Sequence, residues 1–325
     1  MDFTPWTVFT DLGLIAVLLL FGQWLRARIG LIQRLFLPAN VLAGLLGLSL
    51  GPNGFSVLPF SNFLSTYPGI LIALIFAAIP FAAKDAPLQA GRRDVVELGA
   101  YSTLAILLQW SLGMCFALGL LRIIWPDLHS GFGLILPTGF VGGHGTAAAI
   151  GAAFADRGWA DASPLAMTSA TVGILGAVVG GMIWIQWGAR NGSTHFIARF
   201  EDLPPDLRTG LVPQDRRESL GQETLSPMSI DPLAFHAALV LAVSVGGYYL
   251  GHLSAVYMGT YRLPTFCLAF LLAMVVKQLF RFTGVLTYID PKTTVRLSGT
   301  FTDILVAFGI ASVKIPILIQ YAGPL

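Results

Sequence analysis

The feature that most constrains this chain is an apolar segment interrupted by glycine. Residues 131–158 read GFGLILPTGFVGGHGTAAAIGAAFADRG, which is longer than the roughly 20 apolar residues that carry a helix across a bilayer. The centre of the segment is rich in glycine, which lets the backbone turn sharply. Because backbone N–H and C=O groups cannot go unpaired in lipid, irregular backbone survives at membrane depth only inside protein or beside a water-filled cavity. The segment therefore predicts a functional site within the membrane.

The composition predicts an all-α integral membrane protein. Of the 325 residues, 55% are hydrophobic and 11% are charged, whereas soluble domains average roughly 25% charged residues. A net charge of +2, without a basic patch, argues against a nucleic-acid partner. The sequence has no Gly-x-Ser-x-Gly elbow, no His-Glu-x-x-His zinc motif and no paired intramembrane aspartate motif, so we do not expect an enzyme.

Windows of about 20 apolar residues indicate eight membrane-spanning helices in addition to the interrupted segment. They cover residues 6–25, 35–52, 64–83, 98–124, 164–187, 232–252, 263–282 and 299–320. The long polar stretch 188–231 is rich in proline and charge and is predicted to be an exposed linker. It divides the chain into an N-terminal repeat with five helices, 1–187, and a C-terminal repeat with three, 232–325.

The distribution of basic residues indicates whether residues 131–155 cross the membrane or return. If they return as a re-entrant loop, 15 of the 19 lysines and arginines lie on one side, and if they cross, the split is 9 against 10. Cytoplasmic loops are enriched in lysine and arginine, so the re-entrant loop is favoured. This topology places the N-terminus outside the plasma (inner) membrane and the linker 188–231 in the cytoplasm.

The two parts of the chain are similar in sequence. LPANVLAGLLGL from Leu37 and LPTFCLAFLLAM from Leu263 agree at six of twelve positions, and each begins the second helix of its part. With the topology above, the first enters the membrane from inside and the second from outside. Inverted repeats of this kind are common in secondary transporters, whose sites lie near the bilayer midplane. The alternative is that Leu-Pro begins two unrelated helices.

The candidate binding site is the tip of the re-entrant loop, which comprises Gly142, Gly143, His144, Gly145 and Thr146. Each half of the loop, about 11 residues long, rises about 16 Å, so the tip is expected near the midplane. The second half directs its helical N-terminus at the tip, which suits a carboxylate. Carbonyl groups freed at the turn suit Na⁺, and no other metal or cofactor is expected.

For each of three residues, the sequence leaves two roles open. His144 either donates to an anionic ligand or is a structural histidine bonded to a neighbouring carbonyl. Thr138, after Pro137, either contacts the ligand or bonds back within its own helix. Asp303, in the eighth predicted helix, either belongs to a cation path or caps the inner end of that helix.

The runs GFVGGHGTAAAIGAAFADRG and LPANVLAGLLG, with the inverted halves, resemble the sodium/glutamate symporter family, the ESS group. The resemblance covers most of residues 6–320. It implies Na⁺-coupled uptake of glutamate by alternating access, with ten spanning helices, a re-entrant loop in each half, and Gly142 to Thr146 as the binding tip. A helix N-terminus does not distinguish glutamate from another small carboxylate, and H⁺ coupling leaves a trace in sequence similar to that of Na⁺.

The C-terminal part departs from the family pattern. It supplies counterparts of helices one to three and then ends at IQYAGPL, without a second re-entrant loop. We therefore expect this chain to hold half of a two-loop site, as a fragment, a natural truncation, or a chain that a second one completes. The alternative function is a transport-incompetent membrane protein with a regulatory or binding role. The oligomeric state is left open, with a homodimer as one option.

Overall fold

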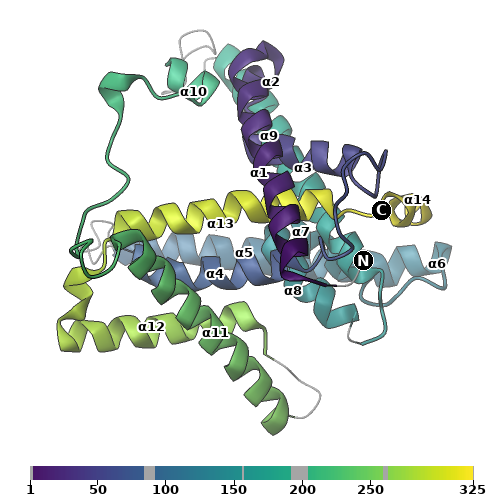
Figure 1. The fold of residues 1–325 in the computed structure, drawn as a ribbon. Coiled ribbons are helices and arrows are strands. Elements are labelled where there is room, and N and C mark those ends of the chain that lie inside the picture. The colour runs from purple at the N-terminus through teal and green to yellow at the C-terminus, as the bar shows by residue number, and fades with distance from the viewer. Residues whose placement is uncertain (1–2, 84–91, 156, 192–203, 259–262, 325) are drawn as a thin grey trace. The chain divides into compact units, whose positions relative to one another are not determined.

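The computed structural model describes residues 3–83, 92–155, 157–191, 204–258 and 263–324. These residues form helices joined by turns and loops, and no β-strand occurs among them. The prediction of an all-α chain is therefore confirmed. Figure 1 shows the helices with their labels.

Within the described residues, six helices are long and apolar enough to cross a membrane, judged by length and composition. The six are α1 (Pro5–Arg28), the continuous run of α5 (Arg92–Phe116), η1 (Ala117–Leu121) and α6 (Arg122–Ile124), then α9 (Ala162–Arg190), α11 (Pro232–Met258), α12 (Thr265–Thr283) and α13 (Pro291–Ala311). Two apolar helices are shorter, α3 (Ala39–Leu50) and α4 (Tyr67–Ala82). Each of the eight predicted spans overlaps one of these helices, but two of them are shorter than a simple crossing requires.

The remaining helices are short. They are α2 (Gly30–Arg34), η2 (Phe132–Leu134), α7 (Ile135–Phe140), α8 (Gly143–Ala155), α10 (Pro205–Thr209), η4 (Gln214–Arg216), η5 (Val285–Tyr288) and α14 (Ile315–Gln320). Two of them, α10 and η4, lie in the predicted linker 188–231, of which residues 192–203 are outside the described part of the chain.

Local signals explain where α1 begins and ends. Thr4 and Thr7 form a capping box, in which each side chain accepts the backbone N–H of the other residue at 3.2 Å. Pro5 occupies the first helical position, where its missing N–H costs nothing. Arg26 and Arg28 lie in the last turn, where positive charge complements the helix dipole.

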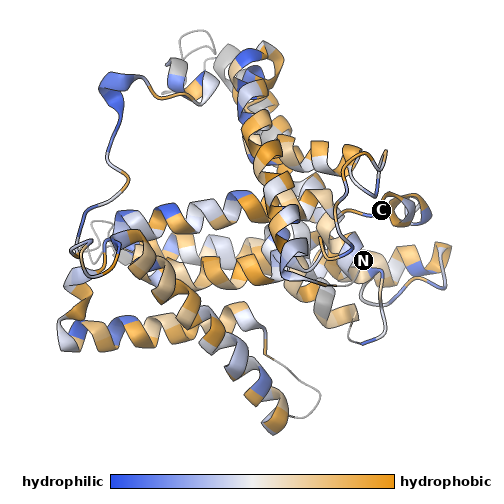
Figure 2. Cartoon of the chain, in the orientation of Figure 1, coloured by the Kyte–Doolittle hydropathy of each residue, from blue (hydrophilic) through white to orange (hydrophobic). Residues whose placement is uncertain are grey.

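The long helices expose apolar side chains. On α5, Leu104, Leu108 and Leu112 are all about half exposed or more, and Figure 2 shows hydrophobic colour along the long helices. Soluble proteins rarely leave apolar patches of this extent in contact with water. Lipid chains cover such faces without cost, so the exposed residues identify the chain as an integral membrane protein.

The chain forms two compact units. The first comprises residues 1–68, 89–216 and 306–325, and the second comprises 69–88 and 217–305. The candidate site predicted from sequence lies in the first unit. Two helices, α4 and α13, contribute residues to both units.

One helix contact recurs in the two units. In the first unit α1 approaches α3 at Gly22, where an added Cβ would lie 3.3 Å from the backbone nitrogen of Ala43. In the second unit α11 approaches α12 at Gly247, where an added Cβ would lie 2.6 Å from the backbone nitrogen of Ala269. Both alanines come five residues after the proline of their Leu-Pro motif. Each of the two similar sequence motifs therefore packs closely against a glycine of the preceding helix, although the atom nearest to the added Cβ at Gly22 is the Ala39 carbonyl oxygen, at 2.6 Å.

The start of α13 differs from the prediction. The helix begins at Pro291 rather than at residue 299 and ends at Ala311. Asp290 explains the early start, because its carboxylate accepts the N–H and the hydroxyl of Thr293 at 2.9 and 2.7 Å, as a capping residue does. Asp303 lies well inside the helix, so the expectation that it caps the inner end is wrong. Hydropathy windows miss such caps because they read only apolar content.

Candidate substrate and ion site

Residues 131–155 form a helical hairpin in the first unit. The chain runs in through η2 and α7 and runs out through α8. The two ends of the hairpin lie together, because the rings of His129 and Trp159 stack with centroids 4.2 Å apart. Phe154 packs edge-on against Trp159, at 5.3 Å between centroids. The residues that flank the segment therefore lie close together.

Small residues bring the hairpin close to α9. Gly139 lies so near Ser169 that an added Cβ would overlap that residue, and an added Cβ at Gly151 would lie 2.6 Å from the Cα of Ser163. The Ser169 hydroxyl donates to the carbonyl of Leu136 at 3.2 Å. Close backbone approach at small residues is a common way for helices to pack in membranes.

The turn between α7 and α8 depends on two glycines. Gly143 has a φ of +63°, in the left-handed region that residues with a Cβ rarely adopt. Gly142 lies against the side chain of Thr146, which leaves no room for a Cβ at that position. The backbone therefore turns at the point where the sequence analysis expects the loop tip.

His144 is held inside the first unit by α9. Its side chain is buried, and its Nε2 lies 3.1 Å from the Thr171 hydroxyl. That hydroxyl donates its single hydrogen to the Met167 carbonyl at 2.9 Å, so Nε2 must carry the hydrogen of the His144 bond. The other ring nitrogen, Nδ1, is then an acceptor. It is buried and has no hydrogen-bond partner among the residues that the structure describes.

The C-terminal part of α13 closes one edge of the same ring. An added Cβ at Gly309 would overlap Cδ2 of His144 and would lie 3.0 Å from its Cγ. Because Nδ1 lies on the other side of Cγ from Cδ2, it is on the ring edge that Gly309 does not cover. Burying the Nδ1 acceptor of His144 without a donor costs about 1–3 kcal/mol.

The other predicted tip residues lie in the same turn. Gly145 is buried and Thr146 is half-buried, both in the first turn of α8. Thr138 is buried in α7 and donates to the Leu134 carbonyl at 2.5 Å. Of its two expected roles, this bond within its own helix is the one observed. Asp303 belongs to the second unit and is not placed relative to the tip.

Two residues at the tip, Thr171 and Gly309, were missed by the sequence analysis. A signal for Thr171 was present, because the run MTSAT places three hydroxyl residues inside the apolar span of α9. Polar residues within membrane helices usually face the interior of the protein. Gly309 carried no comparable signal, since its role depends only on what it packs against.

The tip offers complementary groups to a small zwitterion and a cation. The first N–H groups of α8 point towards the turn and suit a carboxylate, the free Nδ1 of His144 suits a donor, and the last carbonyls of α7 suit a cation. No cluster of three or more His, Cys, Asp or Glu side chains occurs among the described residues. A Na⁺ ion at the tip would therefore be held by carbonyl and hydroxyl oxygens.

The long apolar helices, with the hairpin packed against α9, define a polytopic membrane protein. A family model described as sodium/glutamate symporter matches residues 7–325, nearly the whole chain. The chain therefore belongs to the sodium/glutamate symporter family, whose members are transporters rather than enzymes. This supports sodium and glutamate symport in general, with Na⁺ as the coupling ion. Comparison with curated proteins and with solved structures gives no match.

Proposed function

We propose that the chain carries out Na⁺-coupled symport of glutamate, or of a similar small carboxylate, by alternating access across the plasma membrane. The hairpin tip, from Gly142 to Thr146, binds the substrate. The observation that carries this proposal is the buried Nδ1 of His144, an acceptor without a donor at the tip of a hairpin. A ligand with a hydrogen to donate at this point would satisfy it.

Different groups at the tip bind the carboxylate and the ammonium of glutamate. The first-turn N–H groups of α8 bind the carboxylate, since a helix N-terminus favours negative charge. Nδ1 of His144 accepts a hydrogen bond from the ammonium group. This reverses the expected direction of the His144 bond, because Thr171 fixes the ring hydrogen on Nε2. Na⁺ binds at the carbonyl end of α7.

A re-entrant path for residues 131–155 fits the meeting of their ends at the His129–Trp159 stack. The depth also fits. Thr171, which holds the tip, comes nine residues after Ala162 at the start of α9, and nine residues of helix rise about 14 Å. This is close to half of the bilayer core of about 30 Å, so a ligand at the tip would be reached by a short movement from either side.

We further propose the two-repeat organisation, with repeats 1–187 and 232–325 of opposite orientation joined by a cytoplasmic linker, 188–231. The matching contacts at Gly22–Ala43 and Gly247–Ala269 support the repeat. The excess of basic residues on one side supports an N-terminus outside and the linker inside.

Uptake into proteoliposomes tests this function. The chain is reconstituted with an inward Na⁺ gradient and labelled glutamate, with K⁺ in place of Na⁺ as the control. Accumulation that needs the Na⁺ gradient and that unlabelled glutamate suppresses is the expected result. No uptake by a folded chain, shown by a cooperative thermal transition, would favour the transport-incompetent alternative.

A further inference from the structure

A polar cavity lies in the first unit, apart from the hairpin tip. Its volume is about 190 Å³, and it lies between the loop that joins α3 to α4 and the break between α13 and α14. It is lined by Pro52, Asn53, Ser61, Asn62, Leu64, Ser65, Ser312 and Lys314. Ligand sites for drug-sized molecules are larger, about 300–1,000 Å³, so this cavity admits only a small molecule.

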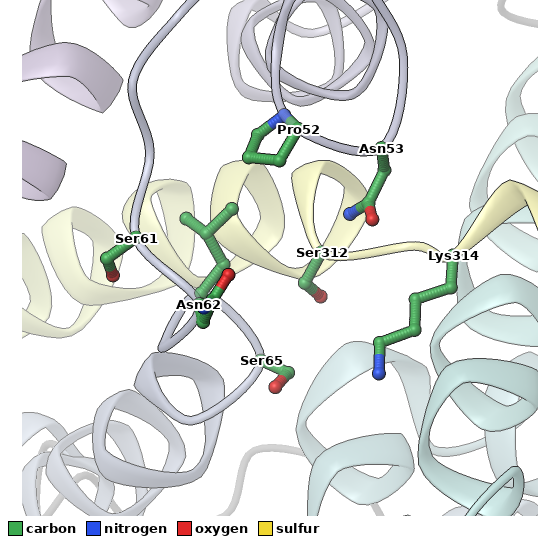
Figure 3. Close-up of a pocket in the computed structure, with 8 residues that line it drawn as sticks. Pro52, Asn53, Ser61, Asn62, Ser65, Ser312 and Lys314 are labelled. Carbon is green, nitrogen blue, oxygen red and sulfur yellow. The ribbon is translucent and has the colours of Figure 1, made fainter. Parts of the chain in front are cut away.

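The cavity contains several polar groups that can donate hydrogen bonds. Figure 3 shows the Lys314 side chain extending into the space bordered by Ser65 and Ser312. Lys314, Asn62 and Ser65 are exposed at the cavity, and among the residues that the structure describes their side chains have no hydrogen bond or ion pair. The ammonium, the amide and the hydroxyl are thus all available to a ligand.

Asp11, the acidic side chain that binds the lining residue Ser61, forms no ion pair with Lys314. Asp11, buried in α1, accepts the backbone N–H of Ser61 at 2.9 Å, the Tyr67 hydroxyl at 2.7 Å and the Ser61 hydroxyl. Its oxygens are therefore occupied by hydrogen bonds from Ser61 and Tyr67. The group that faces the cavity from this side is Ser61, and the ionised group that faces it is Lys314.

We propose that this cavity is a binding site for a carboxylate group, with Lys314 as its counter-charge. A free ammonium group excludes a metal cation from so small a space, whereas an ammonium, an amide N–H and a hydroxyl together match the oxygens of a carboxylate. The site is a second binding position for the carboxylate of the transported substrate, and this role rests on the proposed function.

The cavity is connected to the hairpin tip through one short segment. The Ser312 hydroxyl, which lines the cavity, donates to the carbonyl of Gly309 at 2.9 Å. Gly309 in turn packs against the His144 ring. The cavity therefore borders the segment that follows α13, three residues after the glycine that contacts the His144 ring.

The first test measures glutamate uptake by Lys314→Met, Lys314→Arg and, as a matched loss of charge, Lys292→Met. Lys292 belongs to the second unit and pairs with Glu218 at 3.5 Å. Loss of a charge-assisted hydrogen bond should raise KM at least about tenfold in Lys314→Met. The arginine variant should recover most of the loss, and Lys292→Met should match the parent. An unchanged KM in Lys314→Met overturns the proposal.

A second test does not depend on transport. Ser65→Cys is made in a background in which both exposed cysteines, Cys115 and Cys267, are changed to serine. A negatively charged methanethiosulfonate should label Cys at position 65 faster than a positively charged one, and adding Lys314→Met should abolish that preference. Glutarate should slow the labelling, whereas glutaramide, its uncharged counterpart of the same length, should not.

The two tests separate this inference from the proposed function. If the parent chain takes up no glutamate but glutarate protects position 65, the proposed function fails and the carboxylate site stands. If uptake is normal, but labelling shows neither a charge preference nor protection by glutarate, the site is refuted and the proposed function stands.

Discussion

The imidazole of His144 donates from Nε2 to the Thr171 hydroxyl at 3.1 Å, and this bond makes Nδ1 the free acceptor at the hairpin tip. Thr171 is itself fixed by its bond to the Met167 carbonyl one turn earlier in α9. The protonation pattern of the ring is therefore set by the register of α9 and not by the hairpin alone. Substitutions that replace one ring nitrogen but not the other can therefore distinguish an effect on ligand binding from an effect on packing.

We expect His144→Gln to lose glutamate uptake and to keep its fold. The glutamine amide can reach the position of Nε2 and bond to Thr171, but it places no acceptor at the position of Nδ1. Because a hydrogen bond to a charged donor contributes about 1.5–3 kcal/mol, uptake at low substrate concentration should fall by at least about tenfold. His144→Asn, which places a polar atom near Nδ1, should retain more uptake than His144→Gln. The reverse order, measured as kcat/KM in proteoliposomes, would refute the assigned role of Nδ1.

Gly309→Ala should impair transport through the His144 ring. A methyl group at this position would overlap Cδ2 of the ring, so the ring must move away from Thr171. Overpacking of this kind typically costs about 1–3 kcal/mol. The matched control is Gly299→Ala in the same helix, where an added Cβ meets nothing within 4 Å. Uptake and thermal stability of the two variants are compared, and equal behaviour would contradict the contact.

Gly143→Ala should reduce uptake because the turn requires a positive φ. The strain of a left-handed conformation costs about 1–2 kcal/mol for a residue with a Cβ. Gly158 has a φ of +94° in the loop after α8 and also has open space around it, so Gly158→Ala is a control with similar strain outside the tip. We expect uptake to fall in Gly143→Ala and to persist in Gly158→Ala. If both variants lose uptake equally, the loss reflects general instability.

Asp290→Asn should lower stability at neutral pH by roughly 1 kcal/mol. Burial raises the pKa of the Asp290 carboxyl, but the bonds from Thr293 and from the Gln222 N–H outweigh this effect and leave the pKa below its ordinary value. Because the folded-state pKa is the lower one, the stabilisation is present above the unfolded-state pKa and is lost as the pH falls through the folded-state value.

The pH dependence supplies the measurement for this variant. Thermal unfolding of the parent chain and of Asp290→Asn is followed in detergent from pH 7 down to about pH 3, close to the ordinary pKa of aspartate of about 3.9. The difference in Tm should be largest at neutral pH and should shrink as the pH falls. A difference that stays constant would show that the carboxylate charge plays no part.

Hydropathy predicted where the helices lie because lipid contact demands apolar side chains over whole spans. Each predicted span overlaps a helix. The ends were harder to predict, as α13 shows: its start depends on the cap formed by Asp290 and on Pro291, which are polar or helix-breaking signals that an apolar window ignores.

The candidate site was predictable in part, for a similar reason. The glycines marked the turn, because a positive φ at Gly143 is a local property of the chain. The partners of His144 were not predictable, because Thr171 and Gly309 lie 27 and 165 positions away in the sequence. Which ring nitrogen is free depends on those contacts, so the direction of the His144 hydrogen bond needed the structure.

The seam between the hairpin and α9 has a mechanical consequence. Gly139 and Gly151 bring the backbone of the hairpin close to α9, and small sliding movements of packed helices are the basis of shear motions. The bonds of Ser169 to Leu136 and of His144 to Thr171 then fix the hairpin in position along α9. A ligand that donates to Nδ1 binds the same imidazole ring whose Nε2 bonds to Thr171, so filling of the site is coupled to the position of the hairpin along α9.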